Sequence, residues 1–319
     1  MARIRLRHCT IRFLDGFRGE AKVAVTGSNG QTSLQISEYE SDFGALPLGV
    51  RFTVAGVNEI YTISAITQGP TTGRVKDTLI EADDTDLDVD QITGRVPVGT
   101  TFTIAGNTTD TFTVTATTET GGDTTNIEFT PALHAERLPA DEAAITFVAQ
   151  PAAISVSPPL SSAANLPQAG ADITILGRSL YVKLGDGNMT WDEVTNFEYE
   201  MDRGHIDSVV EGDDEPLSVS VDSVYEFVTA LTGSNVPTPE DVLKQRGEAA
   251  DWITTGADPC ELFAVDIELD YAPPCDVPHE ITVFKEFRWD TINHELGDAT
   301  LRFEGRCKLI EPETIRRNY

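Results

Sequence analysis

The sequence has little that would bind nucleic acid, cross a membrane or build a disulfide framework. Only 23 of its 319 residues are Lys or Arg, against 52 Asp and Glu, and the formal net charge is −29. Phosphate binding needs clustered cations, so this balance argues against a nucleic-acid-binding surface. No apolar run reaches the ~18 residues that a membrane helix needs. The four cysteines are scattered and form no CxxC pair, which argues against a structural zinc site.

The N-terminal segment and the cysteines indicate in which cellular compartment the chain is made and whether its thiols are oxidised. MARIRLRHCTIRFLDG alternates Arg with apolar residues, whereas a secretory signal has an unbroken apolar run behind its positive residues. We therefore expect synthesis in a cytoplasm and no membrane anchor. For the cysteines, buried free thiols are the favoured interpretation, and the alternative is a disulfide between Cys260 and Cys275.

Catalytic and metal-binding motifs are also missing. The sequence has no GxSxG, GxxxxGK[ST] or HExxH motif, and its five histidines are dispersed. The acidic stretch EADDTDLDVD, residues 81–90, lacks the glycine and closing Glu of a calcium-binding loop. Its Asp residues alternate with Leu87 and Val89, which favours the solvated face of a strand over bound calcium. We predict a protein that is not an enzyme and needs no cofactor.

Two related segments lie in the N-terminal half. GALPLGVRFTVAG, residues 44–56, recurs as GRVPVGTTFTIAG, residues 94–106, with identical residues at seven of thirteen positions. A weaker echo is LPADEAAITFVA, residues 138–149. Alternating apolar residues around polar turns predict small β modules, each of them only marginally stable alone. We expect two tandem units, about residues 31–82 and 83–133, inside a repeat region of residues 23–150.

The second half reads as a linker followed by a mainly β domain. Residues 151–171, rich in Pro, Ser and Ala, predict an extended linker. Alternating runs after residue 172 predict strands. One helix is expected in TPEDVLKQRGEAADWITT, where Thr238 can cap and Pro239 suits the first helical position.

The segment from Leu180 to Gly233 resembles the tail tube proteins of long-tailed bacteriophages. A strand ending in Gly-x-Gly-Asn is followed by a large residue, an acidic strand, Asp-Arg-Gly and a Gly-Asp loop before a long strand. The matching residues here are Gly185, Gly187, Asn188, Trp191, Asp202, Arg203, Gly204, Gly212, Asp213 and Pro216. Similarity continues in CTIRFLDG at residues 9–16 and in the Cys-containing segments around residues 258–260, 273–275 and 305–307.

The resemblance implies a β-sandwich or barrel with one flanking helix, formed by residues 1–22 and 172–319. It also implies a virion protein that self-assembles into stacked hexameric rings, through which genomic DNA passes without specific binding. Other expected partners are the tape measure, the tail terminator and a sheath. Compact members lack the repeat region, so we expect it to decorate the outside of the tube. The alternative is a surface adhesin that uses the repeats to recognise a host receptor.

Charged side chains are the candidate functional residues within this resemblance. A wall of the same sign as DNA offers no phosphate anchors, so acidic residues on strands with an apolar opposite face are candidates for the lumen; the alternative is that they only face solvent. These candidates are Glu198, Glu200, Asp202, Asp222 and Glu226. The arginines of the first strand could pair with a neighbouring subunit or within the chain. They are Arg3, Arg5, Arg7 and Arg12.

Overall fold

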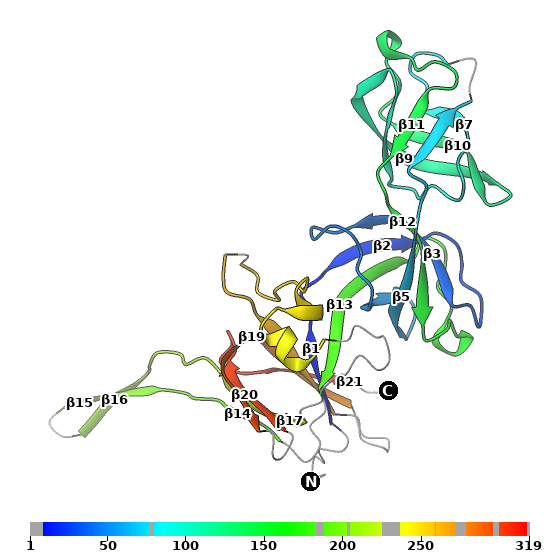
Figure 1. Cartoon of the computed structure of the whole chain (residues 1–319). Coiled ribbons are helices and arrows are strands. Elements are labelled where there is room, and N and C mark those ends of the chain that lie inside the picture. The colour runs from blue at the N-terminus through cyan, green and yellow to red at the C-terminus, as the bar shows by residue number, and fades with distance from the viewer. Residues whose placement is uncertain are drawn as a thin grey trace. The chain divides into compact units, whose positions relative to one another are not determined.

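The protein is mainly β and divides into two compact units (Figure 1). The structure is a computed structural model. It describes residues 9–76, 80–182, 188–202, 205–224, 237–258, 260–271, 279–295 and 300–317. Unit 1 comprises residues 1–17 and 177–319, and unit 2 comprises residues 18–176. Unit 2 is therefore an insertion in the chain of unit 1, as the sequence predicted, but with different boundaries.

Unit 1 is built around an antiparallel sheet with the strand order β14-β17-β20-β19-β18-β1-β13, and β21 pairs with β19. Alternating apolar residues place one face of each strand in the core. The strands are β1 (Cys9–Leu14), β13 (Asp172–Val182), β14 (Met189–Asp192), β17 (Ser218–Val224), β18 (Val265–Tyr271), β19 (His279–Glu295), β20 (Thr300–Arg306) and β21 (Glu313–Arg317).

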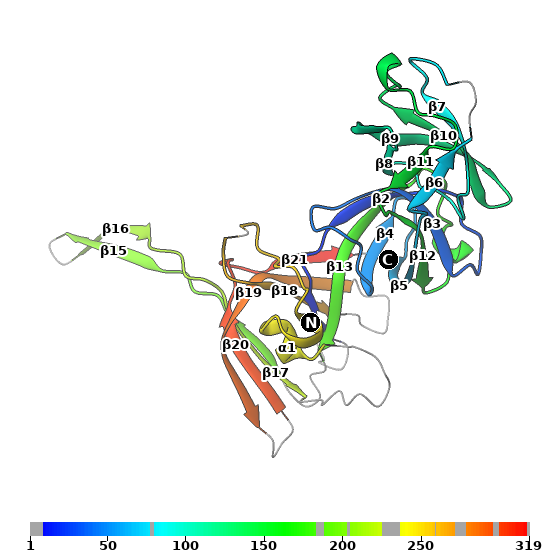
Figure 2. The same cartoon turned by 45° about the horizontal axis from the view of Figure 1, so that its top comes forward.

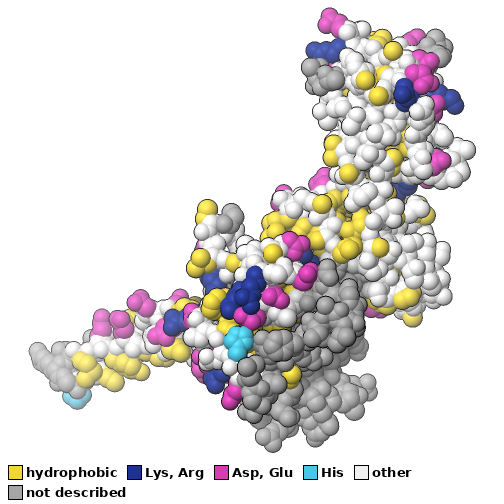
Figure 3. Space-filling model, in the orientation of Figure 1, with side chains coloured by type: hydrophobic (Ala, Val, Ile, Leu, Met, Phe, Trp, Pro, Cys, Tyr) yellow, Lys and Arg dark blue, Asp and Glu magenta, His cyan; other side chains and the backbone are white. Residues whose placement is uncertain are grey.

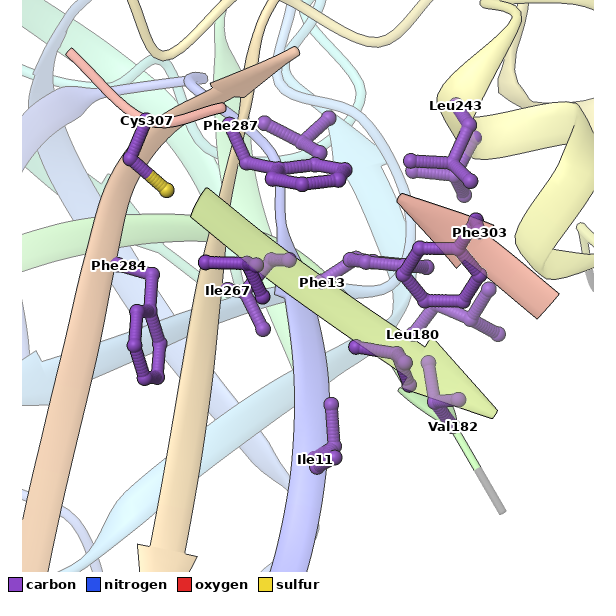
Figure 4. Close-up of a cluster of buried hydrophobic side chains, with 14 of the residues drawn as sticks. Ile11, Phe13, Leu180, Val182, Leu243, Ile267, Phe284, Phe287, Phe303 and Cys307 are labelled. Atoms are coloured by element: carbon purple, nitrogen blue, oxygen red, sulfur yellow. The ribbon is translucent and has the colours of Figure 1, made fainter. Parts of the chain in front are cut away.

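The sheet of unit 1 folds back on itself through β19. The N-terminal half of this 17-residue strand pairs with β18 and the C-terminal half pairs with β20. Between the halves the ladders are irregular, and Glu286 adopts a φ of 52°. The fold brings Phe13 of β1 against Phe303 of β20, with ring centroids 5.4 Å apart (Figure 4). The core therefore lies between two parts of one sheet, as in a sandwich.

One short helix covers this core. α1 (Pro239–Leu243) begins at Thr238, whose hydroxyl accepts a hydrogen bond from the Asp241 amide at 3.2 Å. Its Val242 and Leu243 are buried in the core. The sequence predicted the cap, but the helix ends earlier than expected. Gln245 and Gly247 adopt φ angles of 47° and 56°, which an α-helix cannot continue; the 3-10 turn η5 (Gly247–Ala249) follows.

Unit 2 consists of two six-stranded barrels (Figure 2). In the first barrel the strand order is β13-β2-β3-β12-β5-β4, closed by pairing of β4 with β13. Its strands are β2 (Gly19–Val23), β3 (Ser33–Glu40), β4 (Val50–Val54), β5 (Ile60–Gln68), β12 (Pro151–Ser157) and the N-terminal part of β13. The 3-10 turn η3 (Ser162–Ala164) precedes β13.

The second barrel closes in the order β10-β7-β6-β11-β8-β9 around its own apolar core. Its strands are β6 (Thr72–Val75), β7 (Asp86–Asp90), β8 (Thr101–Ile104), β9 (Asn107–Thr120), β10 (Asp123–Thr130) and β11 (Ala144–Phe147), with the 3-10 turn η2 (Ala135–Arg137) before β11. The echo at residues 138–149 supplies β11. This barrel lies entirely between β5 and β12 of the first, so the two are nested and not tandem.

The prediction of an extended linker at residues 151–171 is wrong for Pro151–Ser157, which form β12. β12 pairs with both β3 and β5, and its Ala152, Ile154 and Val156 point into the first barrel. Proline is tolerated at the first residue of this strand, where no ladder donor is needed. The predicted unit boundary near residue 82 likewise falls inside the second barrel, because β6 already belongs to it.

Candidate assembly surface

A group of exposed apolar side chains in the described part of unit 1 lies on a two-stranded arm. β15 (Phe197–Asp202) and β16 (His205–Glu211) form a separate antiparallel sheet, inserted between β14 and β17. Figures 1 and 2 show this arm extending away from the sheet of unit 1. A two-stranded hairpin alone is marginally stable in water, so its faces need cover from elsewhere.

One face of the arm is apolar and uncovered. Residues directly opposite in an antiparallel pair share a face, and the register places Tyr199 opposite Val209 and Met201 opposite Ile206. Phe197 lies on the same face at the base of the arm, opposite Glu211. The five apolar side chains are 51–61% exposed. Figure 3 shows the hydrophobic side chains gathered along one side of the arm. We call this set of five residues the apolar face.

The opposite face of the arm carries acidic side chains. Glu198 and Glu200 alternate with the residues of the apolar face. Ser208 lies opposite Glu200 and donates a hydrogen bond to its carboxylate at 2.6 Å. Asp202 ends β15, and its side chain lies outside the described residues. Two of the predicted lumen residues therefore share one exposed face.

The base of the arm is held by Asn196. Its backbone oxygen accepts a hydrogen bond from the Gly212 amide at 2.9 Å. Its side-chain amide donates to the Asp213 carbonyl at 3.1 Å and to the Glu215 carboxylate at 2.9 Å. These contacts fix the point where the arm leaves the β14–β17 ladder.

The other predicted lumen residues do not join Glu198 and Glu200. Asp222 lies on β17, in the main sheet, where its carboxylate is 3.6 Å from the guanidinium of Arg302 on β20. Arg302 also pairs with Glu304 at 2.6 Å. The charge at Asp222 is thus partly balanced by Arg302, which Glu304 shares. Glu226 lies outside the described residues.

Arg12 has its partners within its own chain. Its guanidinium pairs with Glu268 and, at 3.3 Å, with Asp270, both on the neighbouring strand β18. It also lies over the Tyr181 ring, 5.0 Å from the centroid. Burial lowers the pKa of Arg12, but the nearby Glu268, Tyr181 and Asp270 raise it, and the net pKa lies above its ordinary value. The intramolecular alternative therefore describes Arg12, while Arg3, Arg5 and Arg7 lie outside the described residues.

Cys260 and Cys307 are free thiols. Cys307 is buried in the core of unit 1, and burial, with a smaller effect of Asp266, raises its pKa to about 12. Cys9 is half-buried, and burial raises its pKa as well. Cys260 is exposed, unlike the buried thiol that was expected, and is not in a disulfide. Its proposed partner Cys275 lies outside the described residues.

The structure also bears on the acidic stretch at residues 81–90, on metal-binding groups and on membrane-spanning helices. In the stretch 81–90, Leu87 and Val89 are buried while Asp86 and Asp88 are exposed, as predicted for a strand with one solvated face. Within the described ranges, no group of three or more His, Cys, Asp or Glu side chains could hold a metal ion. The helices described are all too short or too polar to cross a membrane.

Sequence reasoning missed the uncovered apolar face. The alternation of residues 197–202 and 205–211 around Arg203-Gly204 predicts a hairpin, and that signal was present. The same alternation is found in strands whose apolar side is packed in a core. Only the structure shows that the side chains of this apolar side are more than half exposed.

Comparisons with protein-family models, with curated protein sequences and with solved structures gave no match to this chain.

Proposed function

We propose that the chain is a structural subunit of a bacteriophage tail tube, which self-assembles into stacked rings that form a channel for DNA. The uncovered apolar face of the β15–β16 arm carries this proposal. A chain with 29 excess negative charges repels its own copies. A surface of uncharged, apolar side chains is therefore the one by which copies can associate most readily.

The energetics favour a closed assembly over a simple pair. Covering five half-exposed apolar side chains contributes on the order of 5 kcal/mol. Association costs about 4–15 kcal/mol in lost freedom of movement, so one such contact is weak. In a ring each subunit gives one arm and receives another, and further contacts are then intramolecular. Assembly through the arm should therefore be cooperative.

The sheet edges of the two units also support unit 1 as the part that forms the contacts between subunits. Among the described strands, β14 pairs only with β17 and β21 pairs only with β19, so the sheet of unit 1 has open edges. Both barrels of unit 2 are closed and have none. Open edges can extend a sheet into a neighbouring subunit. Unit 1 is therefore the proposed assembling part, and unit 2 an accessory on the outside of the tube.

The test is polymerisation of the full chain with the apolar face altered. We expect the wild-type protein to form rods in negative-stain electron microscopy. The double variant Tyr199→Ser, Ile206→Ser should remain monomeric in sedimentation velocity, because it removes apolar area on both strands. Its fold should persist, since both side chains are exposed.

The matched control is Glu198→Gln, Glu200→Gln, on the opposite face of the same arm, which should still form rods. Rods that form equally well from the Tyr199→Ser, Ile206→Ser variant would show that the arm is not the assembly surface. Failure of the wild-type chain to polymerise, even with a tail initiator present, would contradict the tail tube function and favour the adhesin alternative.

A further inference from the structure

The two barrels of unit 2 have the same topology. Numbered along each barrel's own chain, strand one pairs with strands two and six, and strand five pairs with strands two and four. Strand three pairs with strands four and six in both. The order β2-β3-β4-β5-β12-β13 therefore matches β6-β7-β8-β9-β10-β11 strand for strand. Six-stranded barrels allow many other orders, so this agreement indicates one fold used twice.

The agreement extends to individual hydrogen bonds. Equivalent backbone amides outside the regular ladders donate to equivalent carbonyls at nearly equal distances. The pairs are Gly49 to Ile63 (2.9 Å) and Gly99 to Val114 (2.9 Å), Ala55 to Asp172 (2.8 Å) and Ala105 to Ala144 (2.8 Å), Val156 to Thr32 (2.8 Å) and Phe129 to Thr85 (2.7 Å), and Leu160 to Gln31 (2.8 Å) and Leu133 to Asp84 (2.9 Å).

The cores and irregularities match as well. Phe52 and Tyr61 have ring centroids 5.5 Å apart at 31°, and Phe102 and Phe112 have centroids 5.4 Å apart at the same angle. Two positions with positive φ, which is uncommon for residues other than glycine, are equivalent in the two barrels. They are Glu38 (51°) with Gln91 (54°), and Gly170 (81°) with Glu142 (64°), where glycine stands only in the first barrel.

The barrels differ at the end of one ladder. In the first barrel the β5–β12 ladder ends where the Gly69 amide donates to the Gln150 carbonyl at 2.8 Å. In the second, the equivalent β9–β10 ladder ends with Thr120 opposite Asp123. In the first barrel, residues 70–149 connect the two strands at this end of the ladder, and they include the whole second barrel. In the second barrel, only the Gly121-Gly122 turn connects the two strands.

We infer that the end of this hairpin is an insertion port, at which a barrel accepts a complete second barrel without change to its own fold. Gly121 and Gly122 adopt φ angles of 67° and 97°, and no other atom lies within 4 Å of where a Cβ would stand on either. Chain ends that a ladder already holds side by side tolerate a long insertion, because closing a longer loop costs little.

Unit 2 is likewise inserted at the end of a ladder, here the β1–β13 ladder of unit 1. The Asp15 amide donates to the Arg178 carbonyl at 3.0 Å, at the end of the β1–β13 ladder. Unit 2 begins after Phe17 and ends before Gly177. The chain thus carries one module inside a hairpin of another, twice over, which supports insertion at ladder ends as its mode of growth.

The first experiment removes the inserted barrel. Residues 70–149 of the full chain are replaced by Gly-Gly, which copies the turn that closes the second barrel. We expect amides of β3 and β12 to stay protected in hydrogen exchange measured by mass spectrometry, about 100-fold or more slower than an unfolded chain. Exchange of these amides at the unfolded rate would overturn the inference.

The second experiment adds a barrel. A further copy of residues 70–149 is inserted between Gly121 and Gly122, and in the control between Gly106 and Asn107, directly after the two-residue Ala105-Gly106 turn of β8–β9. Both sites are tight turns, but Asn107 is buried. Protection of β7 and β10 should persist in the first chain and be lost in the control. Equal loss at both sites would contradict a specific port, whatever the excision shows.

Discussion

At the scale of single residues, Asp15 is a charge of unit 1 that is both buried and paired. It is fully buried, pairs with Arg178 at 2.6 Å, and accepts backbone hydrogen bonds from Phe17 at 3.1 Å and Ile253 at 2.8 Å. Removing one partner of a buried pair leaves the other uncompensated, which costs about 3–5 kcal/mol. We expect Asp15→Ala to lower the free energy of unfolding of unit 1 by about that amount.

The control substitution is at Asp251, a second carboxylate that pairs with Arg178. Arg178 also pairs with Asp251 at 2.7 Å, but that carboxylate is exposed, and exposed pairs contribute about 0–1 kcal/mol. Asp251→Ala should therefore have little effect. All three tryptophans, Trp191, Trp252 and Trp289, lie in unit 1, so urea unfolding followed by their fluorescence reports this unit alone. Similar losses in both variants would show that burial of Asp15 is not what matters.

At the scale of elements, α1 can be tested through its cap. The Thr238 hydroxyl accepts from the Asp241 amide, and the Thr238 amide donates to the Asp241 carboxylate at 3.1 Å. Loss of such a cap costs about 1 kcal/mol. Thr238→Ala should reduce the stability of unit 1 by that amount in the same fluorescence assay, whereas Thr238→Ser should keep it. If Ser is as harmful as Ala, packing of the methyl group, and not the hydrogen bond, stabilises this end.

The elements also show what the sequence can and cannot predict. Alternation predicted strands in the repeat region and after residue 172, although the sequence predicted a linker at β12, and Thr238-Pro239 predicted the start of the helix, because both signals are local. The nesting of the barrels was missed because pairing of β12 with β3 joins residues more than a hundred positions apart, and the same local pattern suits a tandem order. The exposure of Tyr199 and Ile206 was missed for a related reason: period-2 alternation shows that a strand has two faces but not what covers either.

At the scale of the whole molecule, removal of unit 2 tests whether unit 1 alone forms the contacts between subunits. Residues 18–176 can be excised by joining Phe17 to Gly177, because the β1–β13 ladder already brings Asp15 and Arg178 together. The remaining chain closes this hairpin with a short turn and keeps every strand of the unit 1 sheet except the part of β13 that belongs to the first barrel.

We expect the excised chain to retain the tryptophan fluorescence of the folded protein and to form rods of smaller diameter than the wild type. This result follows if the arm and the open sheet edges of unit 1 make the contacts between subunits. Electron microscopy of both proteins at equal concentration gives the comparison. A folded chain that forms no rods would show instead that unit 2 holds neighbouring subunits together, because only the nested barrels would then be missing from the assembly.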